Sequence, residues 1–129
     1  MAEHMTPGSI RHLVRLHDST ITEARRLLRR CLSEQATAQT ALTEAVRSIA
    51  RETERVMTGS GDDREVESFA AWLGRSRRMA GAAEARLGTA AADTAIARAA
   101  LGLAEAASAS ADILMTRRRQ AERPCGSRS

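Results

Sequence analysis

The chain has 129 residues, enough for one domain, and it contains one Phe, one Trp, no Tyr and two prolines. All twenty basic residues are Arg, which we attribute to codon usage in a GC-rich genome, so the net charge of +4 does not by itself identify a partner. Alanine, the best helix former, dominates, and no apolar run reaches the ~20 residues of a membrane span; these features argue against a bulky globular core and against a transmembrane protein.

A first helix is predicted over residues 10–57. Thr6 and Pro7 precede it with the chemistry of a helix start, because Thr can cap the first turn and Pro is favoured at the first helical position. From Ile10 onward a seven-residue repeat typical of coiled coils begins. Its a positions are Val14, Ile21, Leu28, Gln35, Leu42, Ile49 and Val56. Its d positions are Ile10, His17, Ala24, Cys31, Ala38, Ala45 and Glu52.

A turn is predicted over residues 58–62, and a second helix over about 63–122. Gly59 is expected to end the first helix with positive φ, and Asp62 with Glu65 has the spacing of a capping box. The second helix carries its own seven-residue repeat. Its a positions are Val66, Leu73, Ala80, Leu87, Thr94, Leu101, Ser108 and Met115. Its d positions are Phe69, Ser76, Ala83, Ala90, Ala97, Ala104 and Ala111.

These elements predict an all-α fold, a long antiparallel two-helix coiled-coil hairpin that forms a single domain over 1–129 with a polar tail at 123–129. A connection of five residues makes the two helices antiparallel neighbours and sets residue i opposite about residue 120 − i. We call the a and d positions the seam. The end that holds both termini is expected to be cationic, through Arg11, Arg15, Arg117, Arg118 and Arg119. The turn end is expected to be acidic.

No pattern typical of an enzyme is present, and we expect neither catalytic residues nor a cofactor or metal. His12 and His17 are five positions apart, which does not put both rings on one helical face as a metal pair requires. There is no glycine-rich phosphate loop and no GxSxG sequence. Cys31 lies on the apolar stripe, where we interpret it as a small hydrophobic residue, and Cys125 lies in the polar tail.

Both aromatic residues lie in the segment Phe69-Ala70-Ala71-Trp72-Leu73. Phe69 and Leu73 occupy seam positions, which favours a local core near the turn. Trp72 lies beside the seam, where a two-helix structure cannot bury it fully, so it is equally well interpreted as an interface anchor. One position next to the seam is repeatedly glycine, either as a smooth stripe for a docking helix or through relaxed selection on an exposed face. Its members are Gly74, Gly81, Gly88 and Gly102.

The sequence resembles the FliJ/YscO-type stalk proteins of flagellar and type III protein export, in their Ala-rich alphaproteobacterial form. The resemblance covers nearly the whole chain and is carried by residues 13–16, 23–27, 69–73 and 116–123. It implies a cytoplasmic protein, peripheral at the inner face of the inner membrane, that links a hexameric export ATPase to the export gate and also binds export chaperones. It implies gate contact through Phe69 and Leu73, and Trp72 is the candidate if the seam occupies those two. The arginine end would face the ATPase by position alone.

Three other interpretations remain open. Trp72-Leu73-Gly74 suggests a secreted helical hairpin of the WXG type, although that motif belongs in the turn. Apolar residues off the seam, including Leu27, Ile96 and Leu103, favour a self-associating coiled-coil scaffold that forms a four-helix dimer. Nucleic acid could bind the arginine end, but no aromatic residues that could stack on bases are interleaved with these arginines. We therefore expect protein partners and no nucleic acid. We also expect no small-molecule substrate, and membrane contact only through the gate.

Overall fold

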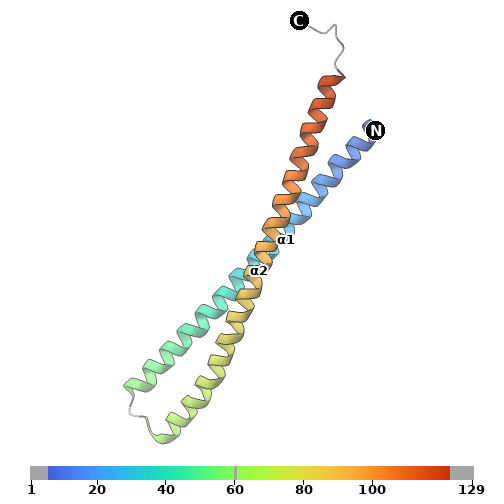
Figure 1. The fold of residues 1–129 in the computed structure, drawn as a ribbon. Helices are drawn as coiled ribbons and strands as arrows, with labels where there is room; N and C mark the ends of the chain where they lie inside the picture. Colours follow the sequence, from blue (N-terminus) through green and yellow to red (C-terminus); the bar gives the residue numbers. More distant parts are fainter. Residues whose placement is uncertain (1–5, 60, 123–129) are drawn as a thin grey trace. The chain divides into compact units, whose positions relative to one another are not determined.

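The chain is all-α, and its two helices pack as an antiparallel hairpin (Figure 1). The computed structural model describes residues 6–59 and 61–122; the polar tail with Cys125, and His4, lie outside the described residues. Helix α1 spans Pro7–Thr58 and helix α2 spans Asp63–Ala121. The predicted fold class is therefore confirmed. Neither helix is long and apolar enough over the described residues to cross a membrane.

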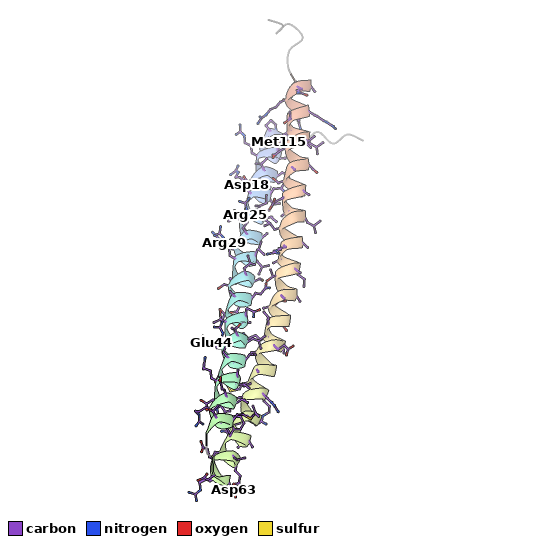
Figure 2. The ribbon with its side chains drawn as sticks, turned by 90° about the vertical axis from the view of Figure 1, so that its left-hand side faces the viewer. Asp18, Arg25, Arg29, Glu44, Asp63 and Met115 are labelled. Carbon is purple, nitrogen blue, oxygen red and sulfur yellow. The ribbon has the colours of Figure 1, made fainter. Side chains whose placement is uncertain are left out.

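Both helix starts are capped by the side chains that the sequence indicates. The backbone N–H of Ser9 donates to Thr6 Oγ1 at 3.1 Å, so Thr6 caps α1 and Pro7 is its first residue, as the Thr6–Pro7 pair indicates. The backbone N–H of Glu65 donates to Asp62 Oδ1 at 2.8 Å, so Asp62 caps α2. Asp63 then opens α2 beside the turn (Figure 2). Each cap satisfies a backbone donor that the first turn of a helix leaves unpaired.

The end of α1 differs from the prediction at Gly59. No glycine among the described residues has positive φ, so Gly59 does not form a left-handed cap. Its N–H instead donates to Arg55 O at 3.1 Å, the helical i to i−4 pattern, and the Thr58 hydroxyl donates to Glu54 O at 2.9 Å. The expectation of positive φ was wrong because the helical hydrogen bonding continues through Gly59 and leaves no need for a reversal there.

The chain divides into two compact units, which are described separately below. The turn unit comprises Arg29–Ala95, with the second part of α1, the turn and the first part of α2. The terminal unit comprises Met1–Leu28 and Ile96–Ser129, with the first part of α1 and the last part of α2.

In the turn unit, two ion pairs between the helices report the register. Arg55 Nη1 lies 3.3 Å from Glu65 Oε1, and Arg86 Nη2 lies 3.1 Å from Glu34 Oε2. In each pair the two residue numbers sum to 120, as predicted from the position of the turn. One register therefore holds over at least the 21 residues of α1 that separate Glu34 from Arg55.

The seam is a thin layer of small side chains. Every predicted seam residue except Val66 is buried or half-buried. The buried ones are Ala38, Ala90 and Thr94 in the turn unit, and Ala97, Ala104 and Ala111 in the terminal unit. Burial of Thr94 does not leave an unpaired polar group, because its hydroxyl donates to Ala90 O at 2.9 Å. No large side chain among the described residues is fully buried, since alanine at d lets the helices approach without enclosing bulk.

Candidate protein-binding surfaces

The two aromatic side chains form one cluster near the start of α2. The rings of Phe69 and Trp72 stack with their centroids 5.9 Å apart and their planes 26° apart. Phe69, Trp72 and Leu73 are all half-buried. The seam therefore takes much of Phe69 and Leu73, and neither presents a free side chain in the way that direct gate contact requires. Trp72 lies beside the seam, as its heptad position indicates.

Trp72 also lines an open groove between the helices of the turn unit. The groove has a volume of about 230 Å³ and is lined by Ala45 and Ser48 from α1 and by Trp72, Ser76 and Met79 from α2. Small residues of α1 stand opposite large apolar residues of α2, so the groove has an apolar wall with two hydroxyl groups at hand. This arrangement suits the insertion of an apolar side chain from another protein. It contains no carboxylate or imidazole that could transfer a proton.

The α1 side of this groove was missed by the sequence analysis, although the predicted register contained it. Ser48 and Trp72 sum to 120, and Ala45 with Ser76 sums to 121, so both small residues could have been placed opposite the aromatic segment. In the sequence analysis, only large side chains were considered as interface anchors. A groove forms where the facing residues are small, so Ala45 and Ser48 were not identified.

A second hollow lies between the helix ends of the terminal unit. It has a volume of about 220 Å³, and three of the five predicted basic residues line it: Arg11 from α1, and Arg118 and Arg119 from α2. The other lining residues are Pro7, Ile10, Met115 and Glu122. Arg15 and Arg117 are exposed but do not line the hollow. Met115 marks its position on α2 in Figure 2.

Glu122 modifies the charge of this hollow, which the sequence analysis did not foresee. Arg118 Nε donates to Glu122 Oε1 at 3.1 Å, so one of the three guanidinium groups is already paired. Arg11 and Arg119 have no ion-pair partner among the residues that the structure describes. The hollow thus offers two available guanidinium groups beside the apolar surface of Ile10 and Met115, a combination suited to an acidic peptide.

At the turn, Arg55 joins carboxylates of both helices. Hydrogen bonding to Glu52 raises the pKa of the Arg55 guanidinium, and Glu65 contributes in the same direction. This arginine therefore forms ion pairs with the protein's own acidic residues and connects the first turn of α2 to the last turns of α1. The predicted acidic character of the turn end is reduced by this contact.

The histidines and the described cysteine do not gather into a site in the described part of the chain. His12 is exposed and His17 is half-buried on the seam. No three His, Cys, Asp or Glu side chains within residues 6–59 and 61–122 are placed to hold a metal ion together. Cys31 is a free, half-buried thiol.

Trp72-Leu73-Gly74 lies within α2, nine residues after the helix begins at Asp63. A hairpin of the WXG type carries this motif in its turn, and the turn here is formed by other residues. The placement of Trp72 inside a helix therefore argues against the secreted-hairpin interpretation.

No protein-family model matches the sequence, and comparisons with curated proteins and with solved structures find no match either. The resemblance to the export stalk proteins therefore rests on residues 13–16, 23–27, 69–73 and 116–123 alone.

Proposed function

We propose that this protein is a non-enzymatic coiled-coil adaptor that binds other proteins through the Trp72 groove and the arginine hollow. Following its resemblance to the export stalk proteins, we propose that its partners are a hexameric export ATPase and an export-gate protein, with export chaperones as further ligands. It would then act in the cytoplasm, held at the inner face of the inner membrane by the gate.

The observation that carries this proposal is the presence of two chemically different surfaces on one hairpin. The groove in the turn unit is apolar and contains the only Trp of the chain. The hollow in the terminal unit is cationic and lies where α1 begins and α2 ends. Two surfaces of unlike chemistry select two different partners, which is what a linking protein requires and what a scaffold that binds only itself does not.

We assign the groove to the gate protein and the hollow to the ATPase. Trp72 and Met79 supply the apolar area of the groove, so Trp72, which lines it, takes the role of contact residue in place of Phe69 and Leu73, which occupy the seam. Arg11 and Arg119 supply the charge of the hollow, with Arg15 and Arg117 as exposed basic neighbours. Binding at the hollow would weaken as salt rises, because exposed charges are screened.

Affinity capture from native lysate with the tagged protein tests this proposal. The wild type is expected to recover an ATPase and a gate component. Trp72→Ala should lose the gate component and keep the ATPase, whereas serine at Arg11, Arg118 and Arg119 together should do the reverse. Recovery of neither partner by the wild type, or normal motility and protein export after deletion of the gene, would contradict the proposal.

Matched controls separate the surfaces from general effects of mutation. Met57 is 81% exposed on α1 and lines neither surface, so Met57→Ala should retain both partners. Serine at Arg26, Arg29 and Arg30 removes the same charge as the triple variant but on exposed positions away from the hollow. This control should also retain the ATPase; its loss would mean that net charge, and not the hollow, determines binding.

A further inference from the structure

The last part of α2 has an unusual distribution of charge. Charged residues make up 28% of the chain, yet residues 96–116 contain only Arg98, Glu105 and Asp112. These three are spaced by seven, so they lie along one side of the helix. The remaining circumference of this segment, all of it in the terminal unit, carries no charge.

On the side opposite these charges, α2 carries a second apolar stripe. Its spacing alternates between four and three residues, the same pattern that makes the seam, and it is distinct from the seam. Its members are Ile96, Ala100, Leu103, Ala107, Ser110 and Leu114. All six are exposed, and the large ones, Ile96, Leu103 and Leu114, are 68%, 74% and 64% exposed. We call this set the second stripe.

α1 extends the surface on the same side. In the terminal unit, the hollow brings together Arg11 and Arg119, which both occupy the e position of their heptads, so the g positions of the two helices lie together on the opposite side. In this unit the g residues of α1 include Leu13 and Leu27, and Leu16 lies one turn from Leu13. Leu16 and Leu27 are 54% and 41% exposed. These leucines extend the second stripe onto α1, where the exposed Thr20 and Glu23 lie between them.

The size of this surface is at the upper end of what a monomer usually leaves in water. From Ile96 to Leu114 the helix rises roughly 27 Å, and two adjacent helices are about 20 Å wide, which gives roughly 500 Å². A patch of this size is at the upper end for monomers and commonly marks an interface. Two such patches facing each other would bury about 1,000 Å², the lower limit for a specific protein–protein interface.

The charges at the two ends of the second stripe indicate what covers it. Asp93 comes three residues before Ile96 and Arg117 three residues after Leu114, so both continue the spacing of the stripe. Both are exposed, and neither forms an ion pair within the described residues. The stripe is thus acidic at one end, basic at the other and symmetric in its spacing about position 105, which makes it complementary to a reversed copy of itself.

We propose that a second copy of this chain covers the surface, with its α2 antiparallel to the first across a two-fold axis that crosses the stripe between Leu103 and Ala107. Residue i then faces residue 210 − i of the partner. Asp93 meets the partner subunit's Arg117, Ile96 meets the partner's Leu114, and Leu103 packs over the small Ala107 of the partner subunit. A parallel arrangement would place like charges together at both ends. The proposal is independent of the proposed function, and its test needs no other protein.

Sedimentation equilibrium of the purified chain, under reducing conditions, tests the proposal. The limited area predicts a reversible dimer with a dissociation constant of roughly 1–100 µM. Leu103→Glu would place a charge in the interface and should raise that constant at least ~10-fold. Because Leu103 is exposed, the variant should keep its helical circular dichroism. A wild type that stays monomeric to ~1 mM, or a Leu103→Glu variant that dimerises normally, would overturn the proposal.

Charge reversal tests the orientation. Arg117→Asp sets a carboxylate against Asp93 of the partner subunit at both ends and should weaken the dimer ~5-fold or more at low salt. The double variant Asp93→Arg with Arg117→Asp restores opposite charges and should recover wild-type affinity; a double variant as weak as the single one would refute the antiparallel arrangement. Met57→Glu, on an equally exposed apolar residue away from the stripe, should leave dimerisation unchanged.

Discussion

Arg86 of α2 donates a hydrogen bond through Nη2 to Glu34 Oε2 of α1 at 3.1 Å, across 52 positions of sequence. The two numbers sum to 120, and so do those of Arg55 and Glu65 nearer the turn. The contact therefore reports the register of the hairpin well away from the turn that establishes it. The groove beside Trp72 follows from the same register, because it places Ser48 opposite the aromatic side chain.

The Glu34–Arg86 pair should contribute little to stability despite its good geometry. Its side chains are 64% and 51% exposed, so water and salt screen the attraction. A double-mutant cycle with Glu34→Gln and Arg86→Gln, measured by urea unfolding, should give a coupling free energy of about 0.2–1 kcal/mol at low salt. The coupling should nearly vanish at ~1 M salt. A coupling that does not respond to salt would mean that the pair is held by packing.

Ala38 should be the position in the turn unit that least tolerates a larger side chain. It is fully buried in the seam, where its small size allows the helices to approach closely. Ala38→Leu should force the helices apart and lower the free energy of unfolding by about 1–3 kcal/mol. The control Ala36→Leu, two residues away on an exposed face, should change it by less than about 0.5 kcal/mol. Equal effects in thermal unfolding would show that the seam is loosely packed.

Loss of the α2 cap should destabilise the hairpin measurably. Asp62 Oδ1 accepts the backbone N–H of Glu65 at 2.8 Å, and Asp62→Ala leaves that donor without its partner. The expected loss is about 1 kcal/mol in chemical unfolding. Asp62→Ser keeps a capping oxygen and should retain most of the stability. If Ser is as costly as Ala, the contribution of Asp62 comes from its charge near the helix start and not from the hydrogen bond.

Two glycines inside α2 should be sites of easy stabilisation. A Cβ atom at Gly81 or Gly88 would meet nothing within 4 Å, and both residues have ordinary helical backbones. Changing either to Ala should therefore raise the free energy of unfolding by about 0.5–1 kcal/mol. Hydrogen exchange of the surrounding amides should slow in parallel. Gly59→Ala is the contrasting variant, because its Cβ would lie 3.2 Å from the Arg55 carbonyl oxygen and no gain is expected.

Features that depend on neighbours along the chain could be predicted from the amino-acid sequence. The two helices, the caps by Thr6 and Asp62, and the seam follow from propensity, hydrogen bonding within one turn and a seven-residue period. The register also follows, since a short turn between two regular helices leaves one way to pair them. The error at Gly59 belongs to the same level, because a glycine permits positive φ without requiring it.

The surfaces that the two helices form together could not be predicted in the same way. The half-burial of Phe69 and Leu73 and the groove that Trp72 lines both depend on the side chains across the interface. The physical reason is that burial is a property of two facing surfaces. A heptad position shows which way a side chain is directed, but the volume of the opposing residues determines whether it is covered.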